Sequence, residues 1–335
     1  MGRVATTKLT ITLLLLGAIL LLASLSLGSS SFELSLLFSS EQQQNIVLQL
    51  RLPRTLVAIG VGCLLATSGC AMQGLFRNAL ADPSIIGVGA GASLGASLFI
   101  FFSAQLAPYS IGHIGSLGGS ALGASFGGAL AVLAVYHIAK HRSYVSVSTM
   151  LLAGMALSAL AAGINQLLQF FSTDQILRQM SLWHMGSLSG SDWLRAVSAI
   201  SLAALCFVLL YRQARVLNIF LLGESEARHL GIKVEQSKHL LIVVVAVATG
   251  SALALAGSIV FIGLIIPHLC RLLVGPDHRI LLPVSAVCGA LLLLAADIGA
   301  RLLLAPSELP VGLLIAFIGA PFFLVLLRKR PAYSY

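Results

Sequence analysis

Long stretches without a charged residue constrain this chain more than any other feature of its sequence. The longest, Pro83–Ala139, runs for 57 residues without an Asp, Glu, Lys or Arg. A helix that spans a bilayer needs about 20 mainly apolar residues, so this stretch can cross twice, with a break near Pro108–Gly112. Only 9% of the residues are charged, which is outside the range of soluble domains. We therefore predict an all-α, polytopic membrane protein that forms one domain over residues 1–335.

The remaining charge-free runs bring the expected number of spans to about ten. The predicted spans are Leu9–Phe32, Thr55–Phe76, two within Pro83–Ala139, Ser143–Thr173, Ala196–Tyr211, two within His239–Cys270 that divide near Gly257, Ile280–Ala296 and Leu309–Leu327. The eighth span is expected to be short because Pro267 and Arg271 interrupt it. The first run is longer than the apolar core of a signal peptide and has no clear cleavage site, so we expect it to remain as a span.

The distribution of basic residues tests this count. Ten crossings place both termini on one side of the membrane, and with a cytoplasmic N-terminus that side receives fifteen of the twenty basic residues. The net charge of +9 therefore comes mainly from basic residues that set the orientation of the chain in the membrane. We expect no nucleic-acid partner.

One interior segment, residues 222–238, is dense in charge and falls on the predicted cytoplasmic side. Glu224 and Glu226 suit a helix N-terminus, Ala227 and Leu230 favour helix, and Gly231 suits a left-handed C-terminal position. The sequence predicts a short charged helix between two spans. Such a helix can serve as a contact surface for another protein.

Two further groups of polar residues are candidate functional sites. Arg51, Arg54 and Arg301 fall on the predicted outer side with few acidic residues near them in the sequence, and they are either lipid-headgroup anchors or docking points for an acidic partner. Ser158, Asn165 and Gln169 share one face of the fifth span. They form either a buried stripe of interhelical hydrogen bonds or one wall of a translocation path.

Glycines recur every fourth residue on the third and fourth spans, at positions 87, 91 and 95 and at positions 115, 119, 123 and 127. Such spacing lets helix backbones approach closely in lipid. The expected contact is either between these two spans of one chain or between two copies of the chain.

Signatures of catalysis are scarce in the sequence. It contains no GxxxxGK[ST] or HExxH pattern, and its five cysteines show no CxxC spacing. We therefore expect a protein that is not an enzyme and that has no catalytic, cofactor or metal site of its own. A secondary transporter is disfavoured because its coupling carboxylate should lie near the midplane, whereas Asp82 and Asp297 lie near span ends.

Several long motifs resemble the FecCD-type permeases of binding-protein-dependent ABC importers for haem, iron-siderophores and cobalamin. They are RLPRTLVAIGVGCLLATSGCAMQGLFRNALADPSIIGVGAGASLGA, LGESEARHLGI, GSIVFIGLIIPHLCRLLVGPDHRILLP and ADIGARLLLAPSELPVGLLIAFIGAPFF. The resemblance covers nearly the whole chain. One departure is Ala79, where the family usually has proline.

The resemblance implies a fold, partners and residue roles. The fold is an inverted-repeat permease that works as a homodimer in the inner membrane, with two ATPase subunits that hold ATP and Mg²⁺ and a periplasmic substrate-binding protein. Glu224, Ala227, Arg228, Leu230 and Gly231 would couple the chain to the ATPase. Arg51, Arg54 and Arg301 would dock the binding protein, and the polar face of the fifth span would line the path.

The substrate class implied is haem, with an iron-siderophore or cobalamin as the alternative. The stretch SLWHMGSLSG at residues 181–190 favours the haem branch. Apolar walls with Met180, His184 and Met185 would suit a flat macrocycle, and Arg178 would suit its carboxylates. Alternatively, these residues only pack a helix on the outer surface.

Overall fold

The structure, a computed structural model, describes residues 3–27, 41–106, 116–141 and 144–328. Its helices are α1 (Arg3–Ser26), α2 (Glu41–Asn45), the π-helix η2 (Ile46–Arg51), α3 (Leu52–Leu75), the 3₁₀ turn η3 (Pro83–Ile86), α4 (Val88–Leu106), α5 (Ser116–Ala139), α6 (Val147–Phe170), α7 (Asp174–Met185), α8 (Trp193–Arg212), α9 (Ala214–Phe220), α10 (Glu224–His229), α11 (Val234–Ala256), α12 (Ile262–Val274), α13 (His278–Leu302) and α14 (Val311–Arg328). Two short antiparallel strands, β1 (Lys140–His141) and β2 (Tyr144–Val145), join α5 to α6.

The predicted spans correspond to ten apolar helices of the described chain. Seven of them, α1, α3, α5, α6, α8, α11 and α13, are long and apolar enough to cross a membrane. The other three, α4, α12 and α14, contain shorter apolar stretches. The expected division of the seventh and eighth spans near Gly257 is confirmed, because α11 ends at Ala256 and the short α12 begins at Ile262. The predicted break near Pro108–Gly112 and the end of the first predicted span lie outside the described residues.

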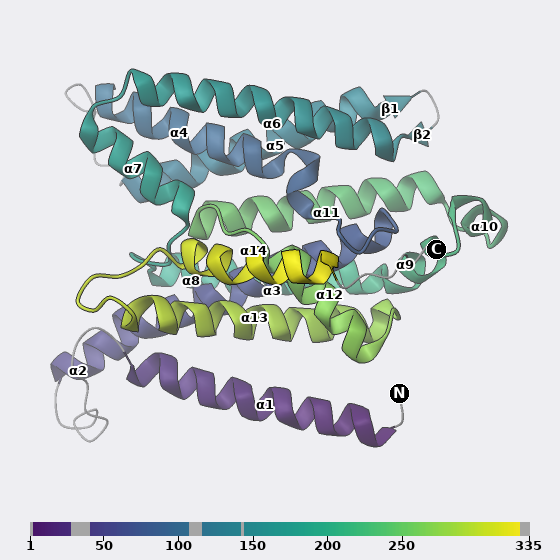
Figure 1. Cartoon of the computed structure of the whole chain (residues 1–335), viewed down its shortest axis with the longest axis horizontal. Coiled ribbons are helices and arrows are strands. Elements are labelled where there is room, and N and C mark those ends of the chain that lie inside the picture. Colours follow the sequence, from purple (N-terminus) through teal and green to yellow (C-terminus); the bar gives the residue numbers. More distant parts are fainter. Residues whose placement is uncertain (1–2, 28–40, 107–115, 142–143, 329–335) are drawn as a thin grey trace.

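The long helices run roughly side by side as a bundle with two distinct ends (Figure 1). Helix α1 begins and α14 ends at the same end of the bundle as α10 and the β1–β2 hairpin, which we call the α10 end. At the opposite end, α1 finishes near α2 and the start of α3; we call this the arginine end. An even number of crossings gives this arrangement.

Helix α3 forms the centre of the bundle and is buried on nearly every side. Small residues let its neighbours approach closely: a Cβ atom on Gly62 would lie 2.3 Å from the carbonyl oxygen of Gly289 in α13, and one on Gly69 would lie 1.8 Å from that of Gly263 in α12. Lipid tails are as apolar as leucine side chains, so such close packing replaces the hydrophobic effect as the force that holds helices together.

The glycines of α4 and α5 pack these two helices against each other. A Cβ atom on Gly95 would lie 2.0 Å from the carbonyl oxygen of Gly123, and one on Gly91 would lie 2.3 Å from that of Gly127. The intramolecular alternative for this spacing is therefore confirmed for these four residues. Gly115 lies outside the described residues.

Two short helices lie outside the predicted spans: α7, which matches the helix that one alternative placed around Met180 and His184, and α9, which was not expected from the sequence. Helix α7 lies between α6 and α8 at the arginine end and is amphipathic, with Ile176 and Met180 buried. The short helix α9 precedes α10, and its Leu217 and Phe220 are buried. Neither is long enough to span a bilayer, so a search for apolar runs does not find them.

Candidate functional site

Two polar clusters lie at opposite ends of the bundle. At the arginine end, two of the three predicted docking arginines satisfy the C-terminus of α1. Nη1 of Arg51 donates to the carbonyl oxygens of Leu25 (2.8 Å) and Ser26 (2.7 Å), and Nη1 of Arg301 donates to those of Ser24 and Leu27 (both 3.1 Å). The last carbonyls of a helix have no partner within it and attract cations. Arg51 and Arg301 are 6% and 4% exposed, so both are held inside the chain.

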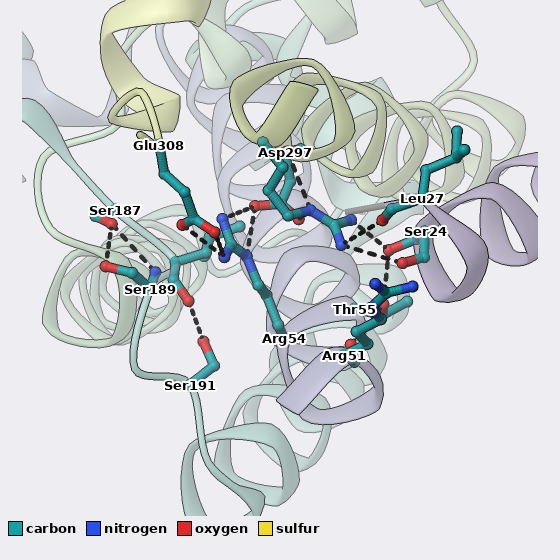
Figure 2. Close-up of polar contacts among 12 residues, drawn as sticks. Ser24, Leu27, Arg51, Arg54, Thr55, Ser187, Ser189, Ser191, Asp297 and Glu308 are labelled. Carbon is teal, nitrogen blue, oxygen red and sulfur yellow. Dashed lines mark hydrogen bonds and ion pairs between the residues drawn. The ribbon is translucent and has the colours of Figure 1, made fainter. Parts of the chain in front are cut away.

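The third arginine, Arg54, is held by two carboxylates. Its Nη2 lies 2.9 Å from Oδ1 of Asp297, and its Nη1 lies 2.8 Å from Oε2 of Glu308. Figure 2 shows Arg54 between these two acidic side chains. Asp297 is fully buried and also pairs with Arg301, whose Nε lies 3.1 Å from Oδ2. A buried carboxylate is stable only when it is paired. Asp297 thus joins two arginines that come from different helices.

This geometry corrects one expectation. The sequence indicated few acidic residues near Arg51, Arg54 and Arg301, but Asp297 and Glu308 leave the group with a net charge of only +1. Asp297 is far from Arg54 in the sequence, and only the packing of α13 against α3 brings them together. The docking role of the three arginines stays a prediction, and Arg54 is the member whose side chain keeps the most exposure, 13%.

Apart from these two clusters, another polar group connects α4, α6 and α7. Nδ2 of Asn165 donates to Oγ of Ser93 at 2.9 Å, and the ring nitrogens of His184 lie 3.4 Å from the hydroxyl oxygens of Ser93 and Ser97. Burial lowers the pKa of His184, which favours the neutral ring. This group ties the amphipathic α7 to two of the predicted spans.

The predicted path residues of α6 differ in their surroundings. Asn165 is buried and makes an interhelical hydrogen bond, as one of the two alternatives for the polar stripe requires. Oγ of Ser158 donates to the carbonyl oxygen of Gly154 in its own helix at 2.7 Å, and Gln169 is half-buried. Met180 is buried in α7. A path-lining role for Ser158, Asn165 and Gln169 stays a prediction.

At the α10 end, the predicted charged helix is present and ends as expected. Gly231 adopts a positive φ of 79°, its N–H donates to the carbonyl oxygen of Arg228, and the N–H of Ile232 donates to that of Ala227. These two bonds form a Schellman motif, which satisfies the last carbonyls of the helix. Ala227 is fully buried and fixes α10 against the bundle.

The charges of α10 pair with α11. Nζ of Lys238 lies 2.7 Å from Oε2 of Glu224 and 3.5 Å from Oε1 of Glu235. Arg228 is more distant, 4.0 Å from Glu224 and 3.8 Å from Glu235, and its side chain is 60% exposed. Exposed ion pairs of this kind contribute little to stability. Lys238 is only 3% exposed, and nothing in the sequence distinguishes it from the other lysines on this side.

Apolar side chains are exposed around α10. Leu222 and Leu230 are 64% and 59% exposed, and Leu221 is 40% exposed. They lie beyond the ends of the predicted spans, where water rather than lipid is expected. Exposed leucines grouped beside a charged helix are typical of a surface that another protein covers.

A contact between α9 and the start of α13 fixes the segment that leads into α10. Asn218 in α9 donates from Nδ2 to Oδ1 of Asp277 at 2.6 Å, and its Oδ1 accepts from the backbone N–H of His278 at 2.8 Å. Asp277 also caps α13 by accepting from the N–H of Arg279. The backbone N–H of Arg279 and the side chain of Asn218 lower the pKa of Asp277. Helix α9, which leads into α10, is thereby attached to α13.

These features define a helical membrane protein with one arginine-rich end and one end that carries a charged, partly apolar contact helix. Within its described residues we find no group of three or more His, Cys, Asp or Glu side chains that could hold a metal ion.

Comparison with known proteins identifies the family. The profile of the FecCD transport family matches residues 14–329. The chain is 43% identical over 333 residues to the hemin transport system permease protein HmuU of Yersinia pestis, with 98% of each chain covered. It is also 43% identical over 291 residues to the cobalamin import system permease protein BtuC of Halobacterium salinarum, which covers 87% of this chain and 75% of that protein.

A solved structure has the same fold. A protein described as a metal-chelate type ABC transporter in an inward-facing conformation superposes with a TM-score of 0.85 at 37% identity, over 97% of this chain and 100% of that chain. The chain belongs to the FecCD transport family. The resemblance inferred from the sequence motifs is confirmed, and so is the all-α permease fold.

Proposed function

We propose that this chain is the membrane-spanning permease subunit of an ABC importer that moves haem across the bacterial inner membrane, with both termini in the cytoplasm. The observation that carries this proposal is the charged helix α10, whose flanking leucines Leu222 and Leu230 are exposed beyond the spans. The surface is suited to a protein partner. In a member of this transport family, a cytoplasmic ATPase is the partner that such a surface would serve.

That partner would carry out the ATP hydrolysis. ATP and Mg²⁺ would be bound by two ATPase subunits, and this chain would have no enzymatic activity of its own. Glu224, Ala227, Arg228, Leu230 and Gly231 would form or support the contact. Two copies of the permease would face each other, with the path along the axis between them and Ser158, Asn165 and Gln169 near it.

At the arginine end, a periplasmic substrate-binding protein would dock. Arg54 is the arginine best placed for contact, since Arg51 and Arg301 are buried against the end of α1. Arg51 and Arg301 would hold the end of α1 in position. The net charge of the cluster favours an acidic partner surface, which would affect association rate more than final affinity.

Haem is favoured as the substrate because the similarity to the hemin permease extends over 98% of both chains. The cobalamin permeases that match are aligned over 87% of this chain. An iron-siderophore or cobalamin, moved by the same machinery, is the second candidate, and the fold shared with a metal-chelate type transporter supports it. An ion-coupled secondary transporter is the remaining rival.

The proposed mechanism is alternating access. Closure of the ATPase dimer on ATP would displace α10, and the spans near the axis would rearrange so that substrate released by the docked binding protein passes through. Nucleotide can drive this change only if its binding favours one conformation over the other.

The experiment is uptake into vesicles that contain the permease and its ATPase, with the binding protein inside or outside as orientation requires. ATP-dependent uptake of haem, well above that of a ferric siderophore or cobalamin, is expected. Preference for one of the other two substrates would overturn the haem assignment alone. Uptake that proceeds without ATP, or failure of the ATPase to purify with the permease, would overturn the importer assignment itself.

Replacing Glu224 and Arg228 together by alanine tests the contact. Uptake driven by ATP should be lost, because both side chains lie on α10. Full uptake by an intact complex would show that α10 is not the site of coupling.

A further inference from the structure

Lys238 is a buried cation in the second turn of α11. Its Nζ lies 2.7 Å from Oε2 of Glu224 and 3.5 Å from Oε1 of Glu235, and it is 3.4 Å from the carbonyl oxygen of Val145. Only 3% of the residue is exposed. Burying an ammonium group is costly unless it is paired and hydrogen-bonded. These three oxygen partners therefore fix the position of the side chain closely.

The three partners belong to three different elements. Glu224 opens α10, Glu235 lies in the first turn of α11, and Val145 ends strand β2. Glu235 strengthens the attachment to β2, because its Oε2 accepts from the backbone N–H of Val145 at 3.0 Å. Lys238 and Glu235 thus hold both backbone polar groups of Val145.

Val145 leads directly into α6. The next residue, Ser146, is the N-cap of that helix, and its Oγ accepts from the N–H of Thr149 at 3.3 Å. The N–H of Ser146 donates to the carbonyl oxygen of Ala139 at the end of α5. The position of Val145 therefore sets the position of the first turn of α6. Figure 1 shows the hairpin and α10 at the same end of the bundle.

Arg228 does not provide an equivalent connection. Its side chain is 60% exposed, and its guanidinium is no closer than 3.8 Å to Glu235. Water screens such a pair, and the side chain remains free for a partner surface. The buried connection between α10 and α6 runs through Lys238.

We propose that Lys238 is a positioning residue that transmits the displacement of α10 to the N-terminus of α6. The proposal rests on the proposed function, in which an ATPase moves α10. When α10 moves, the pair between Glu224 and Lys238 moves α11 and Val145 with it, and the first turn of α6 follows. A connection of this kind is a coupling between two sites through a contiguous, buried network.

The test compares wild type with Lys238→Met in vesicles that hold the complete complex of permease, ATPase and binding protein. Methionine keeps the apolar stem and removes the charge. We expect the ATPase to remain bound and active, while the amount of substrate transported per ATP hydrolysed falls by about tenfold, within the range of about 5–150-fold found for coupling between sites. Lys8→Met is the matched control, because Lys8 is exposed in α1, and it should transport as wild type does.

Amide hydrogen exchange supplies a readout that a purely stabilising role would not change. In wild type, ATP should alter exchange both in α10 and in residues 144–149. In Lys238→Met the change in α10 should persist and the change in residues 144–149 should disappear. Persistence of both changes, or an unchanged ratio of transport to hydrolysis, would overturn the proposal.

Failure of the proposed function can be distinguished from failure of the proposed role of Lys238. If wild type itself shows no ATP-dependent uptake, the proposed function fails, whatever Lys238 does. If Lys238→Met does not accumulate, Glu224→Gln weakens the same 2.7 Å pair from the other side and leaves Glu235 to neutralise Lys238. An unchanged transport ratio in Glu224→Gln would then overturn the proposal.

Discussion

The guanidinium of Arg54 in α3 lies 2.9 Å from the carboxylate of Asp297 in α13, which is fully buried. The same carboxylate lies 3.1 Å from Arg301, so one acidic side chain neutralises two arginines inside the arginine end. Arg301 in turn binds carbonyl groups at the end of α1. One carboxylate thus connects α3 with α13 and, through Arg301, with the end of α1.

Replacing Asp297 by asparagine should destabilise the protein strongly. The variant keeps the shape of the side chain but leaves two buried guanidinium groups without its charge, and removal of one partner of a buried ion pair costs about 3–5 kcal/mol. Unfolding by denaturant in detergent measures the loss. Glu308→Gln is the control, because the Glu308 side chain is 32% exposed and should lose far less. Equal losses in the two variants would show that Asp297 has no special role.

Glu308→Gln also tests docking at the arginine end. The substitution makes the cluster more positive without breaking the pair between Arg54 and Asp297. If an acidic binding protein docks there, its association should become faster and more sensitive to salt. Arg54→Glu should have the opposite effect on association. Surface plasmon resonance at two salt concentrations checks both, and association rates that do not respond to either charge would contradict docking at this cluster.

The sequence predicted the features that depend on local composition. Each apolar helix was found because a long run without charge has few alternatives to crossing the membrane. The end of α10 was found because Gly231 can adopt a positive φ that most residues disfavour. Both inferences need only residues that are close together in the chain.

The arginine cluster could not be predicted because it joins residues distant in the sequence. Nothing local places Asp297 beside Arg54, and the distribution of basic residues treats Lys238 like any exposed lysine on its side. Burial separates it from the others, and burial depends on how α10, α11 and the hairpin pack. The short helix α9 was missed, and α7 was only one of two alternatives, for a related reason, since each depends on a neighbouring surface for its apolar face.

Gly69→Ala should destabilise the contact between α3 and α12. The added Cβ atom would lie 1.8 Å from the carbonyl oxygen of Gly263, so the two backbones must separate. We expect a loss of about 3 kcal/mol or more, at the upper end of the cost of overpacking. Thermal unfolding in detergent measures it. Gly118→Ala, whose Cβ atom would meet nothing within 4 Å, should not lose stability, and a similar loss there would contradict the close-packing argument.

Stability should fall as the pH is lowered below about 6.5, in part through His184. Burial lowers the pKa of His184 from its ordinary value of 6.5, so the unfolded chain binds this proton at a higher pH than the folded chain does. The contribution of the neutral ring is therefore present above about 6.5 and is lost as the pH falls towards the pKa in the folded protein. Unfolding at pH 7.5 and 5.5 measures it. His184→Gln should show a smaller pH dependence than wild type, and an identical dependence would exclude this residue as a source.

The last prediction separates the two alternatives for the polar face of α6. Asn165→Ala and Ser93→Ala remove the same 2.9 Å hydrogen bond between α6 and α4, and each should cost about 0.6 kcal/mol, the average for such bonds in membranes. If Asn165 also lines the path, only Asn165→Ala should reduce the maximal rate of uptake, by several-fold, while both variants lose similar stability. Uptake and unfolding measured on the two variants side by side provide the comparison. Equal rates of uptake would leave Asn165 with the interhelical hydrogen bond as its sole role.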